Sequence, residues 1–255
     1  GYNEVLLKYG AFVRELAAKE GMNVADLNTA VVEATRRAFA TDPANAENLN
    51  KDRVHPGPGG QLLMAAELLK SWKSPAIVSD VQMTIANGSV SATVKNAALT
   101  ITAQSGGLTW KQKETALPFP VNTSDAITRL AIASSDFMDS LNREMLTVKG
   151  LASGSYQLTI DGEKIASFSS VDLAKGINLA AYNTPMMKQA AEVHRLTLRH
   201  TDIHNTRWRQ YQVPMEKETY PSMSKFLSGF DALEGDIVKQ QRKAAVPVEH
   251  TFQLI

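Results

Sequence analysis

The spacing of apolar residues changes near Pro75, and this change limits the folds that the chain can adopt. Before Pro75, apolar residues recur at helical intervals, so that several of them share one helix face. After Pro75, short segments of alternating apolar and polar residues are separated by turn sequences, as in antiparallel sheets. The sequence therefore predicts a mixed α and β fold whose helical and strand-rich parts follow one another along the chain. The first apolar stripe consists of Val5, Tyr9, Phe12, Val13 and Leu16.

Residues 1–75 have the order of an α/β domain. A helix is expected to end at Glu20-Gly21, followed by a strand from Met22 to Leu27 and a helix capped by Asn28. A further helix is expected after the Gly-Pro-Gly-Gly sequence of residues 57–60. One strand alone has no hydrogen-bonding partner, since a stable sheet needs about three. We therefore expect residues 1–75 to be the end of a larger domain whose N-terminal segment precedes Gly1, with the strand at a sheet edge or paired with another chain.

Residues 76–170 are expected to form a β-rich accessory region. Asn87-Gly88 and Asp161-Gly162 lie between alternating segments and predict tight hairpin turns, whose residues need positive φ angles. Ser105-Gly106-Gly107 separates two further predicted strands, and residues 123–141 are expected to be helical.

Residues 171–255 are expected to form a helical C-terminal region. Thr184-Pro185 is a typical helix start, with proline at the first helical position. A second helix from about Ser222 to Lys243 is its expected antiparallel partner, which makes a helical hairpin. The last residues, PVEHTFQLI, are expected to be extended and to pack back on an apolar surface.

The composition argues against several classes of function. Hydrophobic residues make up 44% of the chain and charged residues 21%, as in folded proteins. The net charge is +1 and no basic block occurs, so we expect no nucleic-acid partner. The absence of cysteine excludes disulfides and thiolate metal sites. No apolar run reaches the length of a membrane span.

Asp52 and His55 are the first candidates for catalysis. A histidine acts as a general base when a carboxylate accepts a hydrogen bond from its other nitrogen, which fixes the tautomer and stabilises the imidazolium. A separation of three residues in a turn can bring these two side chains together. On spacing alone, a turn-forming aspartate and a surface histidine are the simpler interpretation.

The surrounding sequence adds a family resemblance. The stretch DRVHPGPGGQLLMAAELLKSW (residues 52–72) resembles the last signature block of the SGNH (GDSL-type) serine hydrolases, which are lipase-like and acylhydrolase-like esterases. In that block, Asp-x-x-His-Pro precedes the final helix of a flavodoxin-like domain. Tyr9–Ala17 and Val24–Asn28 resemble the helix and the strand that lead to this block. The later stretches Tyr156–Glu163, Pro185–Ala190 and Arg207-Trp208-Arg209 resemble the C-terminal part of a bacterial branch of the family.

The resemblance implies that His55 is the general base and that Asp52 orients it, in acyl transfer from serine to water. It implies a small ester substrate such as an O-acetylated carbohydrate, no cofactor or metal, and a secreted or periplasmic location. The family's Gly-Asp-Ser nucleophile block and its oxyanion donors are not recognisable before Asp52. Ser155 and the serines at 167, 169 and 170 have no nucleophile-elbow context. We therefore expect the chain to need its N-terminal segment and to be inactive alone. A non-catalytic binding or structural module that retains the Asp-His loop is the alternative.

Two other groups of residues have weaker signals. His200 and His204 share a helix face, as metal-binding pairs do, with His194 nearby, but the metalloprotease glutamate is missing and arginines surround them. A solvated or interdomain helix face is therefore the preferred interpretation. The sequence Arg207–Tyr211 could stack on a sugar or a base, although a core tryptophan with arginines at its rim is the more common arrangement.

Overall fold

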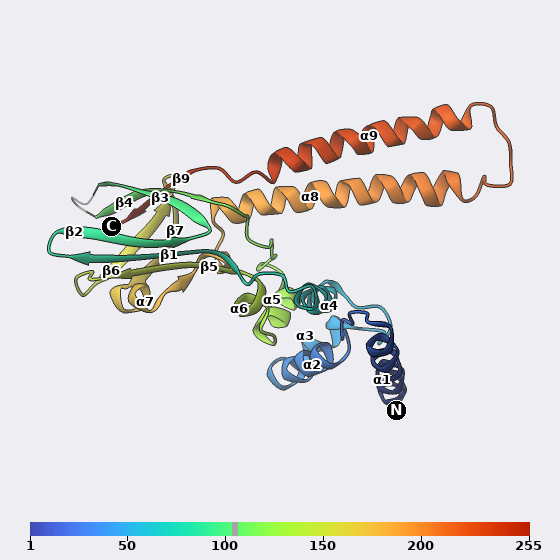
Figure 1. Ribbon diagram of the computed structural model, residues 1–255, viewed down its shortest axis with the longest axis horizontal. Helices are drawn as coiled ribbons and strands as arrows, with labels where there is room; N and C mark the ends of the chain where they lie inside the picture. The colour runs from blue at the N-terminus through green and yellow to red at the C-terminus, as the bar shows by residue number, and fades with distance from the viewer. Residues whose placement is uncertain (104–106) are drawn as a thin grey trace. The chain divides into compact units, whose positions relative to one another are not determined.

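The computed structural model describes residues 1–103 and 107–255 and confirms the predicted mixed α and β fold (Figure 1). Ser105 and Gly106 of one predicted turn lie outside the described residues. The chain forms two compact units: unit 1 comprises Gly1–Val78 and Val121–Glu144, and unit 2 comprises Ser79–Pro120 and Met145–Ile255. These units divide the chain differently from the three segments predicted at 1–75, 76–170 and 171–255, because residues 121–144 pack with the N-terminal helices.

Unit 1 is built from helices. In it, α4 packs against α2, α5 and α6 around a small core in which four of seven buried residues are alanine. The core residues are Ala34, Ala38, Ala46, Leu49, Leu63, Leu130 and Ala131. The helices are α1 (Tyr2–Glu20), α2 (Thr29–Thr41), α3 (Pro43–Ala46), η1 (Glu47–Leu49), α4 (Pro58–Ser71), α5 (Ala126–Ala133) and α6 (Phe137–Leu141).

The segment between α1 and α2 differs from the prediction. Gly21 ends α1 as expected, in the left-handed conformation at φ 67°. The strand predicted from Met22 to Leu27 is not formed, since none of the described residues pairs with it. Asn28 makes no side-chain capping hydrogen bond to α2. Asp26 takes this role instead, because its Oδ1 accepts hydrogen bonds from the backbone N–H groups of Asn28 and Thr29, both at 3.0 Å.

Two sheets form the strand-rich part of the chain. The four-stranded sheet has the order β2-β1-β5-β8, and the five-stranded sheet has the order β3-β4-β9-β6-β7. Asn87-Gly88 and Asp161-Gly162 have positive φ angles and form the predicted hairpin turns. The strands are β1 (Ile77–Ala86), β2 (Ser89–Lys95), β3 (Ala97–Ala103), β4 (Leu108–Glu114), β5 (Arg143–Lys149), β6 (Ser155–Ile160), β7 (Glu163–Ser169), β8 (Ile177–Asn178) and β9 (His250–Leu254).

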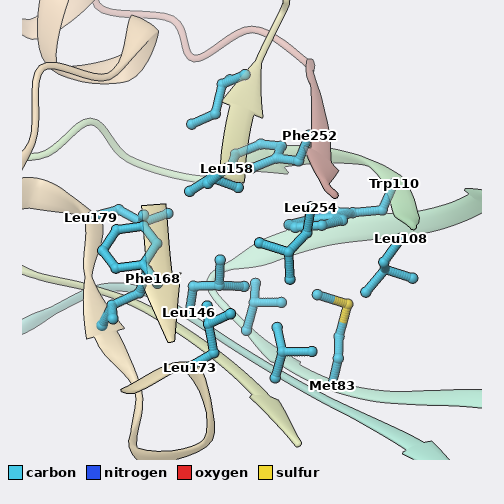
Figure 2. Close-up of a cluster of buried hydrophobic side chains, with 14 of the residues drawn as sticks. Met83, Leu108, Trp110, Leu146, Leu158, Phe168, Leu173, Leu179, Phe252 and Leu254 are labelled. Carbon is cyan, nitrogen blue, oxygen red and sulfur yellow. The ribbon is translucent and has the colours of Figure 1, made fainter. Parts of the chain in front are cut away.

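The apolar faces of both sheets contribute to one large core (Figure 2). Met83 and Leu146 come from the four-stranded sheet, and Trp110 comes from the five-stranded sheet. Trp110 pairs with Phe252 across β4 and β9, and their rings stack with centroids 5.1 Å apart. The C-terminal strand β9 therefore lies in the middle of its sheet, where it is hydrogen-bonded on both sides.

The predicted helical hairpin is present in unit 2. Thr184 caps α8 (Pro185–Thr206) by accepting a hydrogen bond from the N–H of Met187 at 3.1 Å. A π-helical turn, η3 (Arg207–Gln212), follows it, and α9 (Met223–Ala244) returns antiparallel beside α8 (Figure 1). The remaining short helices are α7 (Ser170–Lys175) and η2 (Leu179–Ala181). Throughout residues 1–103 and 107–255, no helix has both the length and the apolar character that crossing a membrane requires.

Candidate active site

The loop before α4 brings Asp52 and His55 together. Oδ2 of Asp52 lies 2.7 Å from Nδ1 of His55, which is the contact that the spacing predicted. Oδ1 of Asp52 accepts hydrogen bonds from the backbone N–H groups of Val54 at 2.9 Å and His55 at 2.7 Å. One carboxylate therefore fixes both the backbone turn and the imidazole ring. Their catalytic role stays a prediction.

The electrostatics of the loop define which nitrogen of His55 carries hydrogen. Hydrogen bonds from the backbone N–H of His55, from its imidazole and from the N–H of Val54 hold the pKa of Asp52 far below its ordinary value. Asp52 is therefore ionised at neutral pH and can only accept hydrogen bonds. Nδ1 of neutral His55 must then be the donor, which leaves the lone pair on Nε2. This is the tautomer that a general base requires.

Close packing at the start of α4 holds the loop in place. Arg53 has a positive φ of 62°, so the chain turns sharply between Asp52 and His55. The N–H of Gly57 donates to the carbonyl of buried Leu49 at 2.9 Å. A Cβ atom added at Gly60 would lie 2.3 Å from the same carbonyl oxygen, so only glycine fits there. The Gly-Pro-Gly-Gly sequence thus lets α4 start directly against the backbone that precedes the catalytic candidates.

The pair is open to solvent. The side chain of His55 is 83% exposed and that of Asp52 is 55% exposed. Among the described residues, Asp52 is the hydrogen-bond partner of the His55 ring. The predicted site thus has an oriented imidazole as its candidate base, but the described contacts supply neither a nucleophile nor oxyanion donors.

The serines of the strand-rich part have structural roles. Ser169 caps α7, because its Oγ accepts from the N–H of Asp172 at 3.0 Å and donates to that residue's carboxylate at 2.6 Å. Ser155 begins β6 and lies opposite Ser169 in the β6–β7 ladder. Ser169 lies where β7 passes into α7, but its backbone has ordinary extended angles (φ −71°, ψ 154°) and its Oγ is used in the helix cap. It therefore lacks the strained turn and the free hydroxyl of a nucleophile elbow, and Ser155 lies at the start of a strand.

His200 and His204 face a carboxylate of the other hairpin helix. Nδ1 of His204 lies 3.1 Å from Oε2 of Glu234, and Nε2 of His200 lies 3.5 Å from the same oxygen. His194 lies apart and lines an open, mostly apolar cavity of about 520 Å³ together with Val193 and Leu117. In the described part of the chain, no three His, Cys, Asp or Glu side chains are grouped in a way that would hold a metal ion.

The aromatic and basic sequence 207–211 is divided between two environments. Trp208 is not a core residue: it is 46% exposed, with the Arg209 guanidinium 5.3 Å from its ring centre. Tyr211 instead packs against Phe226, with ring centroids 4.8 Å apart, and also against Phe230. The π-helical turn rotates Tyr211 inward and leaves Trp208 outside. The predicted core position of the tryptophan was therefore wrong.

Sequence reasoning missed a second Asp-His pair, in which His250 is buried and the side chain of Asp161 is 45% exposed. Nδ1 of His250 lies 2.6 Å from Oδ2 of Asp161, and the N–H of Thr251 donates to Oδ1 at 2.8 Å. Gln112 pairs with His250 in the β4–β9 ladder, and its side-chain amide donates a hydrogen bond to the carboxylate of buried Glu114, also on β4, at 2.6 Å. Burial raises the pKa of Glu114 despite this hydrogen bond and the nearby His250. The available signal was the alternation Trp110-x-Gln112-x-Glu114, which places two polar side chains on the core face.

Comparison with known proteins identifies the fold. No family model matches the sequence, and no curated protein matches it. A solved structure described as a gut microbial diltiazem-metabolizing enzyme has a similar fold, with a TM-score of 0.79 and 22% sequence identity. The match covers 99% of this chain and 66% of that chain, so this chain spans slightly less than two thirds of the neighbour's length. The likeness to an enzyme of known structure defines the architecture of this chain.

Proposed function

We propose that this chain carries the acid–base part of an SGNH-type ester hydrolase. The supporting observation is the Asp52–His55 contact of 2.7 Å, in an exposed loop whose geometry leaves Nε2 of His55 with a lone pair. In this reaction, Nε2 takes the proton of a serine hydroxyl as the serine attacks the ester carbonyl, and later protonates the leaving alcohol. Asp52 stabilises the imidazolium that forms between these steps. The serine belongs to an N-terminal segment of the same protein.

The proposed substrates are small esters such as O-acetylated carbohydrates. The fold similarity supports an enzyme, since the structural neighbour is described as a drug-metabolizing one. Diltiazem is therefore a second compound to test, beside a nitrophenyl acetate reporter. The exposed position of His55 is compatible with a site whose remaining walls come from another segment.

The test compares the intact gene product with the 255-residue chain. We expect the intact product to hydrolyse nitrophenyl acetate and His55→Ala to lower kcat by several orders of magnitude, as loss of a triad member does. The 255-residue chain should show no turnover above its own His55→Ala variant. Lys51→Ala, in the same loop, is the matched control and should retain activity. Turnover that is indifferent to His55 would favour the binding-module alternative, and His55-dependent turnover by the 255-residue chain would place the nucleophile within it.

A further inference from the structure

An open cavity lies where the segment that follows β4 meets the base of the helical hairpin. Its walls are residues 115–120, the first half of α8 and the end of α9. Its volume of about 520 Å³ falls within the range of roughly 300–1,000 Å³ that is usual for small-molecule sites. All the lining residues belong to unit 2, whereas the Asp52–His55 loop belongs to unit 1.

Hydrogen bonds hold the walls of this cavity in place. Nε2 of Gln189 on α8 donates to the carbonyl oxygens of Ala244 and Val246, both at 2.7 Å. These two bonds fix the wall residue Ala245, which lies between their acceptors in the chain. Thr115 is tied to one carbonyl of the turn between β2 and β3, through its N–H at 2.9 Å and its hydroxyl at 3.1 Å. The cavity is therefore largely formed before a ligand enters, which lowers the entropic cost of binding.

The lining of the cavity suits a flat apolar group. Pro118 and Ala190 are buried, and Leu117, Phe119 and Val193 are partly exposed around the cavity. A ligand that covers these three side chains removes apolar surface from water, which is favourable. An aromatic ring fits such a lining well, because it can pack on the ring of Phe119 and on the rigid surface of Pro118.

One polar side chain of the lining is available to a ligand. The hydroxyl of Thr115 donates to a backbone carbonyl, and the hydroxyl of Thr197 donates to the carbonyl of Val193 at 2.9 Å. His194 is exposed at the cavity, and none of the described residues hydrogen-bonds to its ring. An imidazole has an N–H group in its neutral form and two in its charged form. His194 can therefore donate a hydrogen bond to an acceptor on the ligand.

The charges near the cavity favour an anionic acceptor. None of the described lining residues carries a carboxylate, so a cationic ligand finds no counter-charge among them. Arg242 and Lys243 lie on the last turn of α9, just before the wall residue Ala245, and add positive potential there. Glu192, the acidic residue of α8 nearest to His194 in the chain, is paired with Arg195 at 2.6 Å.

We propose that this cavity binds a small aromatic carboxylate. The ring of the ligand packs against Phe119 and Val193, and its carboxylate accepts a hydrogen bond from His194. Binding requires neither Asp52 nor His55, so the site is independent of the proposed ester hydrolysis.

Three probes that share one ring system test this assignment on the 255-residue chain by isothermal titration calorimetry. They are naphthoate, the neutral naphthylmethanol and the cationic naphthylmethylamine. We expect naphthoate to bind about tenfold more tightly than either of the others, because a hydrogen bond to a charged group is the stronger one. No binding at millimolar naphthoate would overturn the proposal. Affinity for the alcohol or the amine that equals or exceeds the affinity for naphthoate would also overturn it.

Variants of α8 test where the probe binds. Val193→Trp fills the cavity and should abolish naphthoate binding. Ala191→Trp adds the same side chain at an exposed position of α8 outside the lining, and should leave binding intact. Unchanged affinity in Val193→Trp, with the helix content verified by circular dichroism, would place the probe elsewhere and refute the site.

His194→Ala tests the polar contact. Because His194 is exposed, this variant decides the question even where Val193→Trp disturbs the hairpin. We expect naphthoate affinity to fall about tenfold and naphthylmethanol affinity to fall less, since the charged acceptor loses the stronger hydrogen bond. His194→Gln keeps a side-chain donor and should restore part of the loss. Unchanged naphthoate affinity, or an equal loss for both probes, would refute the assignment of His194 to the carboxylate.

Discussion

Asp52 is the residue on which the chemistry of the loop depends most directly. Its carboxylate accepts three hydrogen bonds, one from the His55 ring and two from the backbone N–H groups of Val54 and His55. The two backbone donors remain when the side chain at position 54 or 55 is replaced. The pKa of Asp52 is therefore depressed by the turn itself as well as by His55. Because the folded pKa lies below the unfolded one, ionised Asp52 stabilises the fold above the unfolded pKa. That contribution is lost as the pH falls through the folded pKa.

Titration of the Asp52 carboxyl carbon by NMR checks this account. We expect a midpoint well below the ordinary value of 3.8 in the unmodified chain. In His55→Ala the midpoint should rise but stay below 3.8, because alanine keeps the backbone donor at position 55. A midpoint for Asp52 at or above 3.8 in the unmodified chain would contradict the hydrogen-bonded loop.

At the level of elements, local signals predicted structure well where the determinant was itself local. The Asn87-Gly88 and Asp161-Gly162 turns, the Gly21 helix end and the Thr184 cap all depend on neighbouring residues. The Asp52–His55 contact was predictable for the same reason. The strand predicted from Met22 to Leu27 failed because a strand needs a distant partner. The Asp161–His250 pair was missed because it joins residues 89 positions apart.

The start of α4 provides a prediction at the same scale. In Gly60→Ala, the new Cβ would overlap the carbonyl oxygen of Leu49, which is backbone and cannot easily move. We expect unit 1 to lose about 1–3 kcal/mol of unfolding free energy, measured by urea denaturation with exchange at α4 as the probe. Gly235→Ala, in α9 with no atom within 4 Å of the new Cβ, is the control and should gain about 0.5–1 kcal/mol. Equal stability of the two variants would mean that the packing of α4 on Leu49 is not tight.

On the scale of the whole molecule, the two units differ in what stabilises them. The core of unit 1 has seven buried residues, four of them alanine, whereas the core that joins the two sheets has fifteen and contains no alanine. Hydrophobic stabilisation increases with the apolar area removed from water, and alanine buries little. In addition, β9 ties the C-terminus into the middle of its sheet. The sheets should therefore hold their structure under conditions in which the helices of unit 1 open.

Unfolding of the chain should accordingly proceed in two steps rather than one. With increasing urea, we expect peptides from α2, α4 and α5 to lose protection against hydrogen exchange before those from β4, β6 and β9. Trp110 is buried in the sheet core and Trp72 is 66% exposed, so tryptophan fluorescence should report mainly the second step.

Leu158→Ala should lower the unfolding free energy of the sheets by about 2–5 kcal/mol. The urea midpoint of the second step should fall accordingly, and the first step should stay almost unchanged. Leu63→Ala, in the core of unit 1, is the matched variant and should shift only the first step. If every peptide and the fluorescence shared one midpoint, the two units would fold as a single cooperative structure.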